Sequence, residues 1–185
     1  MTRTSVFRAR RIRSALVGTL VVGAGIAAAG PAGAALSPAA SASPAQCSTA
    51  NLSAQLKAGS PGAGQRFATI VLTNTSGSTC TVHGYGGMAL LGAPAQGVPT
   101  DLRRVASPAP GTVTLPPGGS ARSLLHWTVV PGTGESGTAC QPTATAVVVT
   151  PPNQTTAALR PWTFGMVCQH GLIQQNAYVA GSAAF

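Results

Sequence analysis

Few side chains in this sequence could perform acid–base or nucleophilic catalysis. The 185 residues include only two carboxylates, Asp101 and Glu135, and three histidines, His83, His126 and His170. Hydrolysis by paired carboxylates requires two acids in contrasting environments, and both acids here lie in segments expected to be loops. A serine–histidine–aspartate relay lacks the G-x-S-x-G nucleophile motif. We therefore expect no catalytic residue and no enzyme activity.

The four cysteines, Cys47, Cys80, Cys140 and Cys168, offer either metal or disulfide chemistry. They include no C-x-x-C pair, and the histidines have no ligand-like spacing, so we expect no metal and no cofactor. Four cysteines in an exported chain form two disulfides, with three possible connectivities. The midpoints of Cys47 and Cys80, and of Cys140 and Cys168, both fall in turn segments rich in Gly or Pro. Antiparallel neighbours meet around such turns, so we favour Cys47–Cys80 and Cys140–Cys168 over the alternatives.

Two further motifs have both a functional and a structural interpretation. Trp127 and Trp162 could form a platform on which a carbohydrate stacks, but the position of Trp127 in its predicted strand favours a role in the core. Asn74-Thr75-Ser76 is one of three matches to the glycosylation sequon, a short pattern that arises often by chance.

The N-terminal segment has the pattern of an export signal. Arginines between residues 3 and 13 precede an apolar run over residues 15–29, and small-residue sites of the A-x-A type follow. We assign residues 1–42 to a signal peptide and its cleavage region, residues 43–46 to a linker and residues 47–185 to one folded domain. Arg10-Arg11 leaves twin-arginine export open beside ordinary secretion, and an uncleaved membrane anchor is the alternative to cleavage.

Beyond the signal peptide, the net charge falls from +9 to +4, with six basic residues against two acidic ones. These basic residues are scattered apart from Arg103-Arg104, and they are not interleaved with aromatic residues. A nucleic-acid footprint needs clustered Lys and Arg, so we expect no nucleic-acid partner. After cleavage we also expect no membrane partner.

Short apolar segments alternate with turn residues along the rest of the chain. Alternation is clearest over residues 121–130, where the odd positions are expected to face a core and Arg122, His126 and Thr128 to face water. Gly92–Gly111 is predicted to be a loose, proline-rich loop. This pattern indicates an all-β fold, an immunoglobulin-like antiparallel β-sandwich with two disulfides. The predicted strands are Leu52–Lys57, Phe67–Thr73, Cys80–Val82, Met88–Leu91, Val113–Leu115, Ala121–Val130, Ala144–Thr150, Ala157–Phe164 and Leu172–Tyr178.

The four cysteines and two further motifs together resemble a known family. The motifs are the segment from Leu72 to Gly87 and Leu115-Pro116-Pro117-Gly118-Gly119, followed by Leu125-His126-Trp127. The chain resembles the actinomycete domain-of-unknown-function family numbered four thousand two hundred thirty-two, over about Cys47 to Tyr178. The resemblance implies an exported immunoglobulin-like sandwich with no assigned activity or catalytic residues. The chain departs from the family pattern at Gly86-Gly87, which would loosen that bend.

These features favour a non-enzymatic module that is secreted or associated with the cell wall and that has a binding or structural role at the cell envelope. Its expected partner is a cell-wall glycan or an extracellular protein, which a sandwich face, an edge strand or an end loop would bind. The alternative is a secreted inhibitor or protective factor that acts on extracellular proteins through the loop Gly92–Gly111.

Overall fold

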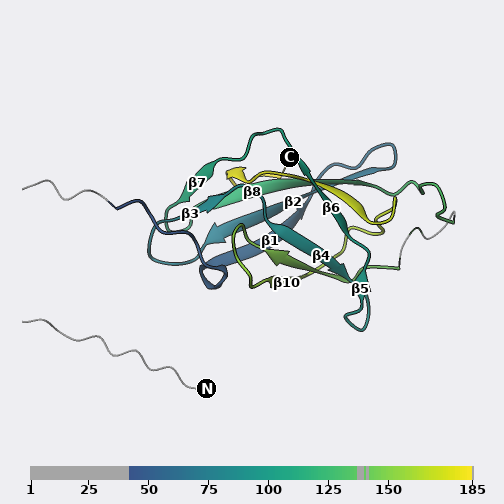
Figure 1. The fold of residues 1–185 in the computed structure, drawn as a ribbon, viewed down its shortest axis with the longest axis horizontal. Helices are drawn as coiled ribbons and strands as arrows, with labels where there is room; N and C mark the ends of the chain where they lie inside the picture. Colours follow the sequence, from purple (N-terminus) through teal and green to yellow (C-terminus); the bar gives the residue numbers. More distant parts are fainter. Residues whose placement is uncertain (1–41, 137–139, 141, 185) are drawn as a thin grey trace, which may run out of the picture. The chain divides into compact units, whose positions relative to one another are not determined.

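Strands account for nearly all regular structure in the domain. The computed structural model describes residues 42–136, 140 and 142–184, so the predicted signal peptide, apart from its last residue, lies outside the described residues. No helix in the described ranges has the length and apolar character needed to cross a membrane. The elements, shown in Figure 1, are the 3-10 turn η1 (Thr49–Asn51) and the strands β1 (Leu52–Ala58), β2 (Gln65–Asn74), β3 (Cys80–His83), β4 (Gly87–Leu91), β5 (Gly97–Val98), β6 (Asp101–Val105), β7 (Thr112–Leu115), β8 (Ser120–Thr128), β9 (Ala146–Thr150), β10 (Ala158–Pro161), β11 (Leu172–Asn176) and β12 (Val179–Ala180).

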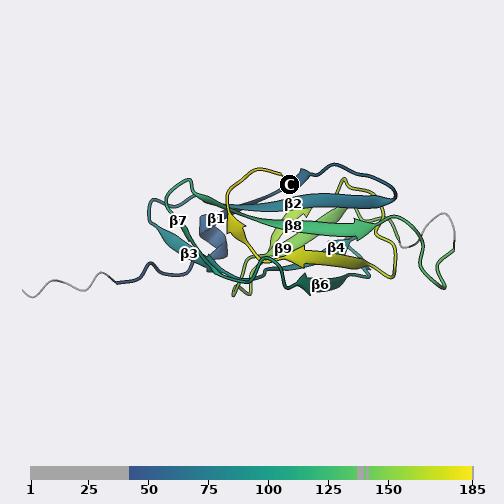
Figure 2. The ribbon, with the colours of Figure 1, turned by 90° about the horizontal axis from the view of Figure 1, so that it is seen from above.

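Two larger sheets and one strand pair make up the fold. One sheet has the order β1-β2-β8-β11-β6, with β12 also paired to β8, and the other has the order β10-β9-β4-β5. Strands β3 and β7 form a separate pair, and Figure 2 shows β2 and β8 side by side in the larger sheet. All pairings between strands are antiparallel except that of β11 with β6. Buried Ile70 and Leu125 of the larger sheet share a core with Leu90 and Val147 of the smaller one, which confirms the predicted all-β sandwich.

The predicted alternation of β8 holds with one exception. Ala121, Ser123, Leu125 and Trp127 are all buried, as a strand with one face on the core requires. Thr128 was predicted to face water but is buried. Its hydroxyl donates to the Gly64 carbonyl oxygen (3.2 Å) and accepts from the Val130 amide (3.0 Å), so the burial costs no unmade hydrogen bond.

The segment from Gly92 to Gly111 is not the loose loop that its prolines suggested. It contains β5 and β6, and each forms one edge of a sheet. Strand β6 carries Arg103 and Arg104 on an exposed edge, where charged side chains block further pairing. Its parallel partner, β11, is about seventy residues away in the sequence, beyond the reach of any local pattern.

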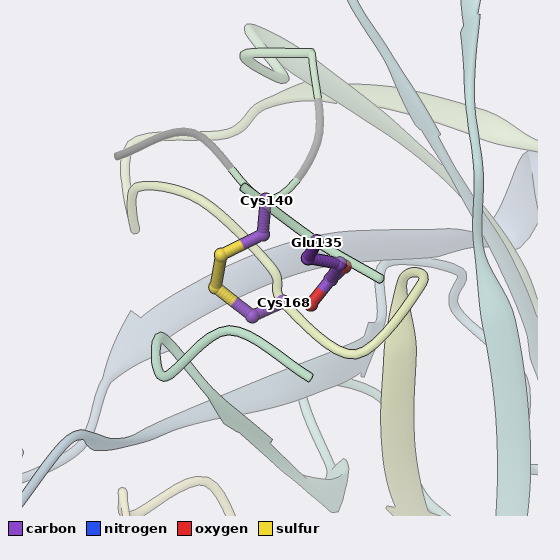
Figure 3. A group of neighbouring side chains, drawn as sticks. All are labelled: Glu135, Cys140 and Cys168. Carbon is purple, nitrogen blue, oxygen red and sulfur yellow. A yellow bond between two sulfur atoms is a disulfide. The ribbon is translucent and has the colours of Figure 1, made fainter. Parts of the chain in front are cut away.

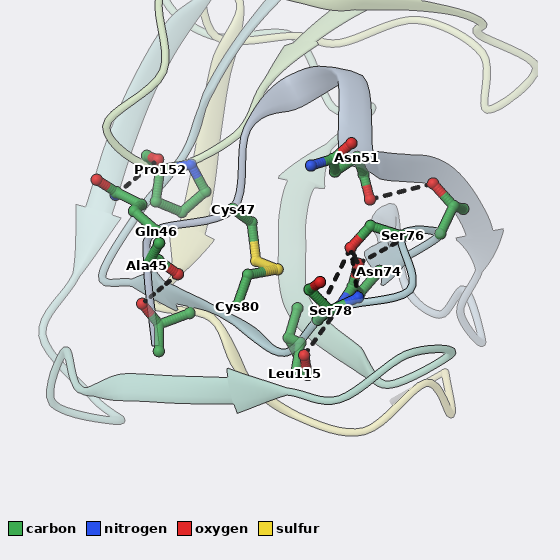
Figure 4. The surroundings of a disulfide bond; sticks show 12 residues. Ala45, Gln46, Cys47, Asn51, Asn74, Ser76, Ser78, Cys80, Leu115 and Pro152 are labelled. Carbon is green, nitrogen blue, oxygen red and sulfur yellow. Dashed lines mark hydrogen bonds between the residues drawn. A yellow bond between two sulfur atoms is a disulfide. The ribbon is translucent and has the colours of Figure 1, made fainter. Parts of the chain in front are cut away.

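Both disulfides have the favoured connectivity, Cys47–Cys80 and Cys140–Cys168. Each closes a loop that, in the chain-entropy account, stabilises the folded state by about 3.5 kcal/mol. Figure 4 shows the first disulfide between the segment that precedes η1 and the start of β3. Backbone hydrogen bonds join Ala45 and Cys47 to Thr81, so this end of the predicted linker lies against β3.

Gly86, at the bend between β3 and β4, is closely packed. A Cβ atom at this position would lie 2.6 Å from the Thr150 carbonyl oxygen and 3.3 Å from the Tyr178 ring. The expectation that Gly86-Gly87 loosens the bend is therefore wrong, because the missing side chain lets the bend approach β9.

Candidate functional site

The two carboxylates are already engaged with other groups of the protein. Asp101 forms an ion pair with Arg103 at 2.7 Å on β6, and both side chains are well exposed. The Glu135 carboxylate accepts backbone N–H groups from Gly132 (2.6 Å), Gln169 (2.7 Å) and His170 (2.7 Å). Glu135 therefore ties the loop after β8 to the segment before β11.

Glu135 also lies beside Cys140 and Cys168, as Figure 3 shows. These three residue types could ligate a metal, and they are the one such group found among the described residues. However, the two sulfurs are joined in a disulfide, so neither is the thiolate that a metal ion needs.

His83 lies on β3, His126 on β8 and His170 in the turn before β11. His83 Nδ1 is 3.0 Å from the Thr112 hydroxyl, and His170 Nε2 is 3.3 Å from the Thr133 carbonyl oxygen. The His126 ring stacks on Phe67 with centroids 4.7 Å apart, on the outer face of the larger sheet.

The two tryptophans are core residues that support a third aromatic ring. Trp127 and Trp162 are only 2% and 3% exposed, and their ring centroids are 5.2 Å apart. Their indole N–H groups donate to the carbonyl oxygens of Met166 (3.2 Å) and Gly165 (2.8 Å). Half-buried Phe164 lies edge-on against both, 5.1 Å from Trp162 and 6.2 Å from Trp127. The tryptophans thus do not form a carbohydrate platform themselves but hold Phe164 in place.

Phe164 and Thr163 line two hollows at the seam where β1, an edge of the larger sheet, meets the segment that follows β10. The first hollow, of about 310 Å³, is lined on one side by β1 and on the other by Arg160 and Pro161. The second, of about 250 Å³, extends to the start of β2 and includes Arg66. We call these two hollows the Phe164 groove; Figure 1 shows β1 beside β10.

Two guanidinium groups give the Phe164 groove its charge. Arg160 donates to the carbonyl oxygens of Ala54 and Leu159, and Arg66 donates to that of Gln65 at 3.1 Å. Within the described residues, neither arginine forms an ion pair. Each guanidinium carries five N–H donors, so both keep donors for a bound anion. An aromatic ring flanked by such groups suits a ligand with an apolar face and anionic substituents.

The sequence did not single out Phe164, Arg66 or Arg160 as site residues. The one available signal was the spacing Arg160-Pro161-Trp162-Thr163-Phe164, which places two aromatic residues and a cation within five positions. Arg66 joins them only because the start of β2 lies beside the segment that follows β10.

A comparison with protein-family models matches residues 47–178 to the family described as Domain of unknown function (DUF4232). The chain belongs to this family. The match covers most of the chain and includes all four cysteines of this DUF4232 domain. Searches of curated proteins and of solved structures found no match.

Proposed function

We propose that this DUF4232 domain is a non-enzymatic binding module of the cell envelope, and that its Phe164 groove binds an anionic glycan. The observation that carries the proposal is the half-buried Phe164 ring, which is fixed on two buried tryptophans and lines a groove with two arginines that form no ion pair within the described part of the chain. A rigid aromatic surface offers one face of a pyranose ring contact area at low entropic cost. The guanidinium groups supply the charge-assisted hydrogen bonds that carboxylate or phosphate substituents require.

Three further features support this proposal. Two disulfides are typical of proteins in an oxidising, extracellular compartment. Asp101 and Glu135 are held by other protein groups, an arrangement that suits structure better than acid–base catalysis. The net charge of +4 beyond residue 42 favours association with an anionic polymer. The alternative, an inhibitor acting through Gly92–Gly111, is less favoured because β5 and β6 draw that segment into sheet edges.

Titration calorimetry with soluble glycans of matched length tests the proposal. We expect the oxidised protein to bind a polyuronate and not dextran, with affinity that falls as salt screens the charges. Replacing Arg66 and Arg160 with glutamine is expected to weaken binding by about 100-fold, since each hydrogen bond to a charged group contributes roughly 1.5 kcal/mol or more.

Arg104→Gln is the matched control for the Arg66 and Arg160 substitutions made singly, because like each of them it removes one positive charge, here from an exposed strand edge away from the groove. If Arg104→Gln weakened binding as much as the Arg66 and Arg160 substitutions, the interaction would be diffuse attraction to a basic protein. That outcome would overturn the groove assignment, as would equal affinity for dextran.

A further inference from the structure

A further hollow, smaller than either part of the Phe164 groove, lies on the outer face of the larger sheet, at the end formed by the start of β2 and the end of β8. It encloses about 100 Å³ and is lined mainly by uncharged polar side chains. We call it the His126 pocket; its lining includes Gln65, His126, Thr128, Gln169, Leu172 and Gln174. Trp127 lines both this pocket and the second hollow of the Phe164 groove, so the two are neighbours.

Strand register explains how these side chains come together. Phe67 on β2 lies opposite His126 on β8, and His126 lies opposite Gln174 on β11. The Phe67 ring stacks on the imidazole with an interplanar angle of 16°. Imidazole Nε2 is 2.7 Å from Gln65 Oε1, and Nδ1 is 3.1 Å from Gln174 Oε1. The ring is therefore fixed by an aromatic face and by two amide groups.

The two glutamine amides are left with complementary hydrogen-bonding atoms. A neutral imidazole has one N–H donor and one bare nitrogen, so it needs one amide that accepts and one that donates. A half-turn of either amide exchanges its oxygen and nitrogen. Both amide oxygens face the ring, so a neutral imidazole requires the Gln174 amide to be turned by half. Gln65 then accepts from Nε2, and Gln174 donates to Nδ1 with its carbonyl oxygen outward. The Gln65 NH2 donates one hydrogen to the Thr128 hydroxyl (3.5 Å) and keeps the other. The pocket then presents one amide donor and one amide acceptor to a ligand.

We infer that the His126 pocket is a subsite for an acetamido group, carried by an N-acetylated amino sugar. An acetamido group has one N–H donor and one carbonyl acceptor, which match the outward Gln174 oxygen and the remaining amide hydrogen of Gln65, and its methyl group would contact Leu172. Pockets for whole drug-sized ligands begin at roughly 300 Å³, so a hollow of about 100 Å³ fits one substituent and not a complete sugar. The sugar as carrier rests on the proposed function; the acetamido chemistry rests on the pocket alone.

Proton NMR of the histidine rings in the intact mature protein tests this inference. The chain has three histidines, so the imidazole signals can be assigned with a His126→Gln variant, and His83 on β3 reports non-specific effects. We expect N-acetylglucosamine to shift the His126 signals saturably, while glucosamine and glucose at the same concentrations leave them unchanged. Gln174→Leu, at an exposed position, should remove the shift without unfolding the protein.

The arms of the titration separate the possible outcomes. Equal shifts with glucose, or none with N-acetylglucosamine, would overturn the acetamido assignment. An N-acetyl-lysine amide that binds more tightly than N-acetylglucosamine would overturn the sugar as carrier. Phe164→Ala is expected to lose affinity for the polyuronate while keeping the His126 shift. Failure of the proposed function and failure of this inference are therefore distinguishable.

Discussion

The amide of Asn74 holds the turn between β2 and β3, and its removal is expected to destabilise the domain strongly. The side chain is fully buried. Its Nδ2 donates to the carbonyl oxygens of Ser78 (2.8 Å) and Leu115 (2.9 Å), and its Oδ1 accepts from the amide (3.0 Å) and hydroxyl (2.7 Å) of Ser76. Figure 4 shows this network beside the Cys47–Cys80 disulfide.

Asn74→Ala removes all four bonds, but the groups left behind differ in cost. Ser78 is exposed and Ser76 half-buried, so water replaces much of what they lose, whereas Leu115 is only 1% exposed. About 0.5 kcal/mol for each of the three bonds whose partners water can reach, together with about 1.5 kcal/mol for the stranded buried Leu115 carbonyl, gives a loss of about 3 kcal/mol in the free energy of unfolding. Asn74→Asp should cost at least as much, because a carboxylate oxygen would face two carbonyl oxygens.

Urea unfolding monitored by tryptophan fluorescence measures this loss, since Trp127 and Trp162 are both buried. Thr75→Ala is the neighbouring control, because the Thr75 hydroxyl makes one exposed hydrogen bond, and it should cost no more than about 0.5 kcal/mol. A loss below about 1 kcal/mol for Asn74→Ala would refute the reasoning. The same network occupies the nitrogen to which a glycan would be attached, so we interpret this sequon as structural.

Three further predictions concern packing, ionisation and the first disulfide. Gly86→Ala should lower the free energy of unfolding by about 2 kcal/mol in the same urea assay, because the added Cβ meets a backbone carbonyl; a neutral effect would contradict the close packing of this bend. Burial raises the pKa of Tyr178 above the ordinary tyrosine value of 10.0, so stability should be full below that pH and fall above it as the unfolded chain ionises. In a Tyr85→Phe variant, ultraviolet absorbance should show no tyrosinate before unfolding, and reversible ionisation of the folded protein would refute the burial. Replacing both cysteines of the first disulfide with serine should cost about 3.5 kcal/mol, and an unchanged urea midpoint would show that this loop closure contributes nothing.

The sequence alone was sufficient to predict those features that depend on residues close together in the chain. The alternation in β8 follows from period-two patterning, and the disulfide pairing follows from turns placed midway between cysteines. The sequence was insufficient to predict a strand that has no alternating apolar pattern of its own. Strand β6 is short, basic and paired in parallel with a strand far along the chain, so only the assembled sheet reveals it.

The candidate sites depend on contacts between distant segments. Arg66 and Arg160 line the same groove only because β1 and the start of β2 lie beside β10 and the segment that follows it. Likewise, Phe67, His126 and Gln174 become neighbours through the register of three strands. Residue types alone directed attention to Trp127 and Trp162, whereas packing leaves Phe164 as the ring at the surface.

Co-sedimentation with washed cell walls of the native host tests the central claim most directly. We expect the oxidised protein to bind these walls saturably, Arg104→Gln to bind as well as the wild type, and Phe164→Ala to lose binding while retaining its fold by circular dichroism. Protein that stays in the fluid at all concentrations, or a Phe164→Ala variant that sediments like the wild type, would contradict the assignment of the Phe164 groove as an envelope-binding site.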